Sequence, residues 1–276
     1  MATTPPTEIE TIEQRDRLLL AVQDRILWLS MQMIHHANNV RENRDGGKVG
    51  GHQASSASVV TLLTSLYFEF MKAGDRISVK PHASPVFHAI QYLLGNLDQK
   101  YLKTLRDFHG LQAYPSRTKD PDPVDFSTGS VGLGAVAPNF AALVNDYVHM
   151  HGTTEDDLEH RFISVIGDAE LDEGSVWEAI AEPTVNRLGN ILWIVDLNRQ
   201  SLDRVIPGMR VRSWREMFEA NGWRVIEAKY GKRLQAAFDE PNGELLQNAI
   251  DEMSNELYQR LLRISPQGLR EWLPQT

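Results

Sequence analysis

The sequence predicts an α/β fold, in which a mainly parallel sheet has helices on both faces. Two short apolar runs, residues 162–166 and 191–195, are too brief for anything but buried strands. A helix-like segment lies between them, so the unit is strand, helix, strand. Because parallel pairing brings the carboxyl ends of both strands to one edge of the sheet, we expect that edge to bind the ligand.

The other elements follow from helical spacing, alternation and turn signals. Apolar residues recur at helical spacing over residues 8–39, and Ile77 and Val79 alternate as in a short strand. Ser84 followed by Pro85 suits the start of a helix. Further helices are expected over 54–71, over 98–108, from about 135, over 172–188 with a break at Pro183, and beyond 230.

Three local expectations are more specific. The Asp-Pro-Asp-Pro run at 120–123 cannot be a helix or a central strand, so it is expected to be an extended surface loop. Ser213 and Glu216 form a capping-box pattern, and the helix that they begin is expected to end near Gly222. Residues 223–228 are predicted to form a third strand.

The composition fits a globular protein with a real core, and we expect one α/β domain. The chain has 276 residues, of which 42% are hydrophobic, and a net charge of −9. It has no long basic run, so nucleic acid is not an expected partner. The absence of cysteine excludes disulfides and thiolate metal sites. No secretory signal pattern and no membrane-spanning run is found, so a cytoplasmic location away from the membrane is expected.

Oxygen-bearing side chains follow both central strands. Asp168 follows the first, and Asn198 comes thirty residues later, just after the second. Carboxylate and amide oxygens suit Mg²⁺ or Ca²⁺, with a diphosphate and water at the remaining positions. The alternative is structural, because an Asp after a strand is most often a cap or turn residue. Glu170, Asp172 and Glu173 likewise complement the N-terminus of a helix.

Glycine-rich segments and histidines mark further candidate positions. Four glycines within residues 46–51 lead into a helix whose N-terminus favours anions, although the Walker pattern is absent. Three glycines within 129–134 precede an alanine-rich helix, and they serve either close helix packing or approach of the backbone to a ligand. His82 lies in a strand-to-helix loop, where ligand groups are common. His88, one turn into that helix, is interpreted as structural.

Together these segments resemble the thiamine diphosphate-dependent enzymes of the transketolase and pyruvate dehydrogenase group. The stretch GGHQAS resembles the GGHxAS segment of homodimeric bacterial pyruvate dehydrogenases, and the segment around His82 has their His-x-Ser-Pro ending. Gly-Asp at 167–168 with Asn198 resembles the diphosphate motif of the group. The resemblance covers residues 45–230 with five motifs in the family's order, and it implies the transketolase-like, thiamine diphosphate-binding fold.

The resemblance implies a role for each matching residue. The ligands of Mg²⁺ would be Asp168, Asn198 and the backbone carbonyl of Gln200. His52 and His82 would be catalytic, in substrate orientation and proton transfer. The residues expected at thiamine diphosphate are Ser55, Ser130, Val131, Gly132, Gly167, Asp168, Ala169, Glu170, Asn198 and Leu202.

Three positions depart from the family's pattern. Ala169 and Arg204 stand where the family usually has Gly, and a β-carbon at 169 would crowd a backbone that approaches a diphosphate. Lys80 stands where family members often carry a Gln that contacts the cofactor. Ala169 and Arg204 favour an alternative, a non-catalytic binding protein that kept the fold.

The resemblance implies oxidative decarboxylation of pyruvate with acetyl transfer to lipoamide; ketol transfer between sugar phosphates is the alternative reaction. We expect residues 1–40 to be an N-terminal helical segment, 41–264 the cofactor-binding domain, and 265–276 a truncated tail. Family polypeptides also have a pyrimidine-binding domain, so the chain is expected to be a fragment or split subunit, inactive alone. Expected partners are pyruvate, that missing domain or a partner chain, a second copy in a homodimer, and a lipoyl acyltransferase.

Overall fold

The computed structural model describes residues 12–43, 46–152, 160–197, 200–201, 204–205, 211–261 and 263–272. Contacts between residues divide the chain into two units. The first holds residues 1–179 and 187–196, and the second holds 180–186 and 197–276. The predicted domain boundaries at residues 40 and 264 remain predictions.

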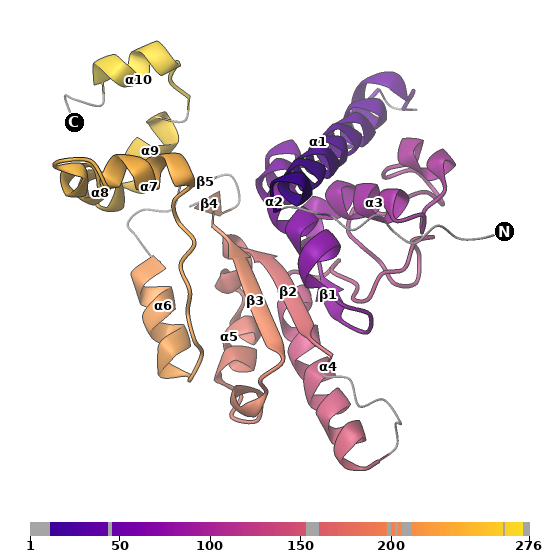
Figure 1. The fold of residues 1–276 in the computed structure, drawn as a ribbon. Helices are drawn as coiled ribbons and strands as arrows, with labels where there is room; N and C mark the ends of the chain where they lie inside the picture. Colours follow the sequence, from indigo (N-terminus) through magenta and orange to yellow (C-terminus); the bar gives the residue numbers. More distant parts are fainter. Residues whose placement is uncertain are drawn as a thin grey trace. The chain divides into compact units, whose positions relative to one another are not determined.

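Three helices of the first unit pack against one another (Figure 1). They are α1 (Ile12–His35), α2 (Gln53–Ser65) and α3 (Ser84–Leu93). Helices α1 and α2 each continue into a π-helical turn, at His36–Val40 and Leu66–Phe70. All three helices confirm the sequence-based expectation. Their fully buried apolar side chains include Ile26, Leu63 and Ile90.

The sheet of the first unit is parallel throughout and has the order β1-β2-β3. Its strands are β1 (Arg76–Ser78), β2 (Phe162–Gly167) and β3 (Ile191–Asp196), each at a predicted position. In the register of the central pair, Gly167 lies opposite Asp196. The segments that follow β2 and β3 therefore begin at the same edge of the sheet.

Helices cover both faces of this sheet, as predicted. Ile163 and Val165 of β2 point into the core formed with α1, α2 and α3. Ser164, between them, faces the other side, where its hydroxyl donates to the carbonyl of Ala135 at 3.2 Å. Ala135 belongs to α4 (Leu133–Met150), the alanine-rich helix, which packs on β2. The alternation along β2 thus divides its side chains between two helical layers.

A buried carboxylate fixes the start of the sheet. Asp75 accepts hydrogen bonds from the backbone N–H groups of Lys72 at 2.8 Å and Arg161 at 2.9 Å, and its side chain pairs with the Arg161 guanidinium. Lys72 and Asp75 precede β1, whereas Arg161 precedes β2. The carboxylate therefore joins the amino ends of two neighbouring strands.

The shorter helices follow the expected turn signals in part. Helix α5 (Gly174–Ala181) ends before Pro183, as predicted. The helix predicted over 98–108 is reduced to a 3₁₀ helix, Gln99–Lys103, because the chain then turns at Arg106 and His109. Those residues have φ of 57° and 58°, and a helix cannot continue through that conformation. Among the described helices, none is long and apolar enough to cross a membrane.

The run at 120–123 is a loop with exposed prolines, as predicted, but one of its carboxylates is buried. Pro121 and Pro123 are exposed, whereas Asp122 is buried. Burial of this carboxylate is possible because its Oδ2 lies 2.8 Å from Nδ1 of His88.

The second unit is mainly helical within the residues that the structure describes. Its elements are the antiparallel strands β4 (Gln200–Ser201) and β5 (Arg204–Val205), and the helices α6 (Val211–Ala220), α7 (Lys232–Phe238), α8 (Gly243–Asp251), α9 (Asn255–Leu261) and α10 (Pro266–Trp272).

Two expectations for the second unit are wrong. Helix α6 begins at Val211, so Ser213 lies inside it and is not its cap. Residues 223–228 form no strand. Trp223 packs its ring edge-on against Phe218 instead, and Ile226 is 78% exposed. One of the apolar side chains that suggested a strand is therefore packed against a helix, whereas another is open to solvent.

Candidate active site

Charged side chains follow all three strands at one edge of the sheet. Lys80 comes two residues after β1, Asp168 follows β2 directly, and Asp196 is the last residue of β3. Asp168 is only 2% exposed and begins a 3₁₀ helix, Asp168–Asp172. Its Oδ1 accepts the backbone N–H of Ala169 at 3.1 Å. The predicted ligand edge is therefore lined by charge that is largely shielded from water.

Lys80 and Asp196 form an ion pair that also includes Ser58. The ammonium of Lys80 donates to Oδ2 of Asp196 and, at 3.3 Å, to Oγ of Ser58. Ser58 in turn donates to the same carboxylate oxygen at 2.6 Å. The side chains of Lys80 and Asp196 are 5% and 16% exposed. The buried ammonium at this position therefore has two acceptors, one of which carries the opposite charge.

The structure brings the two predicted catalytic histidines together. The rings of His52 and His82 are stacked, with centroids 3.8 Å apart and planes 29° apart. His52 precedes α2, and His82 lies in a 3₁₀ turn, Pro81–Ala83, directly after Lys80. Both side chains are exposed, whereas Ser55, in the first turn of α2, is half-buried. The imidazoles can therefore meet a ligand from solvent at the edge where β1 ends.

The glycine-rich segment at 129–134 packs closely, and its approach to a ligand stays a prediction. Gly134 packs closely, because a β-carbon there would lie 2.7 Å from Oγ of Ser78. Gly132 has φ of +82°, which favours glycine, and it places the segment against Glu173. Ser130 and Val131, just before it, are exposed. These two residues are therefore accessible from solvent.

Glu170 lies in the 3₁₀ helix that follows Asp168. Its Oε1 accepts the backbone N–H of Gly167 at 3.0 Å, whereas its buried Oε2 has no hydrogen-bond partner. Burial raises the pKa of this carboxyl, and the backbone N–H groups of Gly167 and Gly132 and the charge of Lys80 oppose that rise in part. The buried Oε2 is therefore an acceptor for which the described residues provide no donor.

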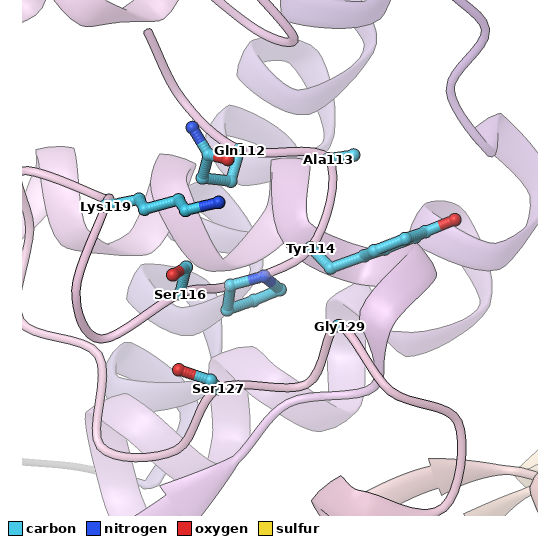
Figure 2. A pocket seen from close by; sticks show the side chains of 8 residues that line it. Gln112, Ala113, Tyr114, Ser116, Lys119, Ser127 and Gly129 are labelled. Carbon is cyan, nitrogen blue, oxygen red and sulfur yellow. The ribbon is translucent and has the colours of Figure 1, made fainter. Parts of the chain in front are cut away.

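A pocket of about 250 Å³ lies next to the histidine pair (Figure 2). Tyr114 lines it, and the Tyr114 ring centroid is 5.6 Å from that of His82. Figure 2 shows the ammonium of Lys119 directed across the pocket toward Gln112. The other lining residues are Ala113, Pro115, Ser116, Ser127 and Gly129. One cation and several polar groups suit a small anionic molecule.

For the remaining predicted site residues, the positions relative to Asp168 stay predictions. Asn198 and Leu202 lie outside the described residues. The backbone of Gln200 is in β4, in the second unit. Of the three predicted Mg²⁺ ligands, Asp168 is the one that belongs to the first unit.

A family model for the thiamine diphosphate-binding domain of transketolase matches residues 69–241. The chain thus belongs to the family of transketolase thiamine diphosphate-binding domains. Solved structures agree in fold: the transketolase of Leishmania mexicana has a TM-score of 0.62 at 22% identity, covering 84% of this chain and 34% of that one. A Pichia stipitis transketolase mutant, R525L, gives 0.63 at 20% identity, with coverage of 85% and 34%.

Sequence relatives of the chain include pyruvate dehydrogenase E1 components. The pyruvate dehydrogenase E1 component of Mycolicibacterium smegmatis is 30% identical over 249 residues, which are 83% of this chain and 26% of the relative. That of Escherichia coli K12 is 28% identical over 223 residues, which are 77% and 24%. The chain therefore spans about a quarter of the length of these relatives.

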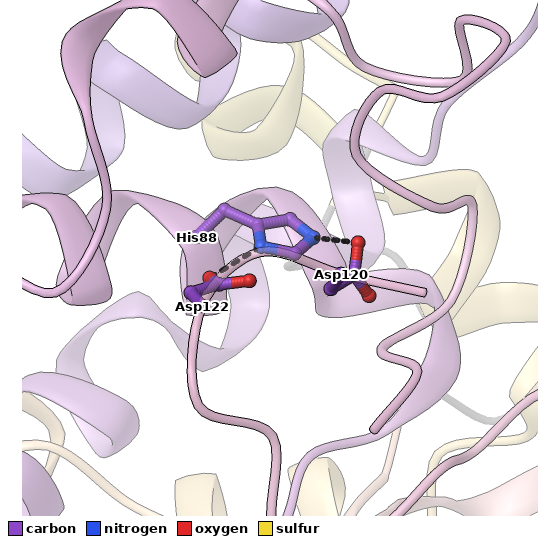
Figure 3. A group of neighbouring side chains, drawn as sticks. All are labelled: His88, Asp120 and Asp122. Atoms are coloured by element: carbon purple, nitrogen blue, oxygen red, sulfur yellow. Dashed lines mark hydrogen bonds and ion pairs between the residues drawn. The ribbon is translucent and has the colours of Figure 1, made fainter. Parts of the chain in front are cut away.

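Two groups of residues were not identified from the sequence. The Ser58–Lys80–Asp196 contacts were missed because their members are far apart in the chain, although Lys80 had been noted as a departure from the family's pattern. The second group is His88 with Asp120 and Asp122 (Figure 3). The alternation of Asp with Pro had suggested exposure there, and no local signal opposed that interpretation.

Proposed function

We propose that the chain is the diphosphate-binding part of a thiamine diphosphate-dependent 2-oxo acid dehydrogenase that acts on pyruvate and passes the acetyl group to lipoamide. The relatives named as pyruvate dehydrogenase E1 components support this reaction. The observation that carries the proposal is the stacked pair of His52 and His82, at the same sheet edge as the buried carboxylate of Asp168.

The described residues fit the cofactor's anionic end and its metal. Asp168 offers a buried carboxylate at the end of a strand, and Glu170 has an oxygen without a hydrogen-bond partner. In the proposal, Asp168 binds Mg²⁺ together with Asn198 and the carbonyl of Gln200. Ser130, Val131 and Gly132 present their backbone to the cofactor. When bound, thiamine diphosphate supplies the nucleophilic carbon and the electron sink for decarboxylation.

The histidines orient the substrate and move protons. His52 and His82 are exposed, and an imidazole can hold or release a proton at Nδ1 or Nε2 near neutral pH. Their stacking restricts both rings, which lowers the entropy lost when they meet a substrate. The pocket beside Tyr114 would take the carboxylate of the 2-oxo acid near Lys119.

The complete enzyme needs more than this chain in the proposal. A pyrimidine-binding domain, on a longer polypeptide or a partner chain, would hold the other end of the cofactor. A homodimer and a lipoyl acyltransferase are the proposed partners. The isolated chain would bind cofactor weakly and would not turn over.

A calorimetric titration of thiamine diphosphate into the purified chain, with and without Mg²⁺, tests the proposal. We expect weak binding that requires Mg²⁺ and is lost in Asp168→Ala, while circular dichroism shows an intact fold. If no binding is seen, the titration is repeated with a family pyrimidine-binding domain supplied in trans. Absence of binding in that mixture would refute the proposal and favour a non-catalytic protein.

Ketol transfer between sugar phosphates is the second candidate, since the neighbours in fold are transketolases. The pocket favours pyruvate over a sugar phosphate, because Lys119 is the one cation among the described residues that line it. Assays of the completed enzyme with pyruvate and with a phosphorylated ketose distinguish the two. In that enzyme, His82→Ala should lower turnover more than it lowers cofactor affinity.

A further inference from the structure

A buried cluster of His88, Asp120 and Asp122 takes no part in the proposed mechanism (Figure 3). His88 is on α3, and the carboxylates belong to the loop that leads to the glycine segment at 129–134. All three side chains are 0% exposed. Each offers a ligand atom within 4.8 Å of the others. Burial of two carboxylates beside one imidazole is costly unless a cation compensates their charge or protonation removes it.

The two ring nitrogens of His88 face different carboxylates. Nδ1 lies 2.8 Å from Oδ2 of Asp122, a hydrogen-bond distance. Nε2 lies 4.0 Å from Oδ1 of Asp120, which is too long for a hydrogen bond. Nε2 of His88 and Oδ1 of Asp122 are both buried without a hydrogen-bond partner. Figure 3 shows the Asp120 oxygen lying off this free nitrogen.

A proton on Nε2 of His88 does not complete this arrangement. The resulting N–H would be a buried donor without an acceptor, which native structures rarely contain. A metal ion completes it after a small movement of the side chains. With bonds of about 2.0–2.2 Å, the imidazole nitrogen and the carboxylate oxygen lie about 3.4 Å apart around a tetrahedral ion and about 4 Å apart when they bind on opposite sides of the ion, and the observed separation is 4.0 Å. A divalent ion also balances the charges of Asp120 and Asp122 when the imidazole is neutral.

We propose that Nε2 of His88 and Oδ1 of Asp120 bind a divalent transition-metal ion such as Zn²⁺ or Mn²⁺. Mixed imidazole and carboxylate ligands suit such ions. Asp122 orients the imidazole by accepting from Nδ1, as the outer partners of metal-binding histidines do. This ion is distinct from the Mg²⁺ proposed at Asp168, and the inference does not rest on the proposed function.

The ion would support one wall of the pocket. Asp120 accepts the backbone N–H of Gln112 at 2.8 Å and that of Ser116 at 2.7 Å, and both of these residues line the pocket. A metal bond from Asp120 to His88 therefore fixes that wall to α3. We expect metal to raise the melting temperature of the chain, because an ion that binds only the folded state stabilises it.

The test uses the whole chain, stripped of metal with EDTA and titrated with ZnCl₂ by calorimetry, without thiamine diphosphate or Mg²⁺. We expect one equivalent to bind. His88→Gln should lose it, and Asp122→Asn should weaken it about 10–100-fold. His149→Gln, which removes an exposed histidine of α4, is the matched control and should keep it. Melting curves followed by circular dichroism show whether each variant is folded.

Three results would overturn the proposal. The first is that neither Zn²⁺ nor Mn²⁺ binds to the wild-type chain. The second is that the equivalent is lost in His82→Gln and retained in His88→Gln, since the exposed His52 and His82 pair would then be the ligand. The third comes from X-ray absorption of the Zn²⁺-loaded wild-type chain, which does not depend on any variant's folding: a first shell with two imidazoles contradicts the expected single imidazole.

Discussion

Replacement of Lys80 by Gln, the residue that the family often carries there, removes the cation from a buried ion pair. The side chains of Lys80 and Asp196 are 5% and 16% exposed, so water screens their interaction poorly. Asp196 would then keep the hydrogen bond from Ser58 but no counter-charge. Breaking one side of a buried pair costs about 3–5 kcal/mol. We expect the lower end, about 3 kcal/mol, because Asp196 has some access to water.

The double variant Lys80→Gln/Asp196→Asn separates the pair from its individual members. Each single variant leaves one buried charge without its partner, whereas the double variant leaves none. We therefore expect the double variant to lose about 1 kcal/mol, less than either single variant, because neutral replacements of buried pairs are often well tolerated. The coupling energy of the cycle should exceed about 2 kcal/mol.

Urea unfolding followed by circular dichroism at pH 7 measures all four proteins of this cycle. Lys100→Gln is the matched control, because Lys100 pairs with Asp98 at the surface, where their side chains are 67% and 61% exposed. That variant should lose less than about 0.5 kcal/mol. Additive effects in the cycle, or a Lys80→Gln chain as stable as the Lys100→Gln control, would refute the reasoning.

Three further predictions concern pH and backbone strain. Burial raises the pKa of Glu170 above its ordinary value of 4.5, so ionisation of this carboxyl lowers the stability of the fold as the pH rises above 4.5. Glu170→Gln should therefore gain stability relative to wild type between pH 4.5 and 7, as measured by urea titrations. The pKa of Asp75 is lowered, because hydrogen bonds from Arg161 and Lys72 outweigh the opposing effect of burial. Asp75→Asn should cost about 3 kcal/mol at pH 7, and this cost should shrink as the pH falls through 3.8, the ordinary value of that carboxyl. Gly132→Ala should cost about 1–2 kcal/mol in thermal melts, because φ is +82° and a β-carbon would lie 3.2 Å from Glu173; an unchanged melting temperature would contradict this.

The elements that the sequence predicted well depend on local pattern. Strands β2 and β3 and helices α1, α2 and α3 were placed correctly, because their apolar spacing is itself the cause of their burial. The strand predicted at 223–228 had suitable residues but has no neighbouring strand in the described structure. A strand is stabilised by its partners, and nothing in the local sequence of this segment states whether a partner exists.

The site residues likewise divide into those that a local motif marks and those that only the folded structure brings together. His52 and His82 could be selected because each sits in a recognisable short motif, and the structure brings their rings together. The contacts of Asp196 join it to Lys80 across 116 positions and to Ser58 across 138. No spacing rule covers such separations, so these pairings become visible only after folding. His88 with Asp120 and Asp122 is a second case, since the loop's two prolines are exposed while the side chains of the carboxylates beside them are buried.

Lys80 departs from the family's pattern, and its contacts in the structure change how that departure is interpreted. Judged alone, a cation in place of an amide at a cofactor edge suggests a site that has lost its function. In the structure that cation is buried with Asp196 and Ser58 as acceptors, and an unpaired ammonium there would destabilise the fold. The position is therefore electrostatically complete, and it gives no support to the non-catalytic alternative. The non-catalytic alternative is supported by Ala169 and Arg204, which stand where the family usually has Gly. The titration of thiamine diphosphate with Mg²⁺ tests whether the chain still binds the cofactor despite these two residues.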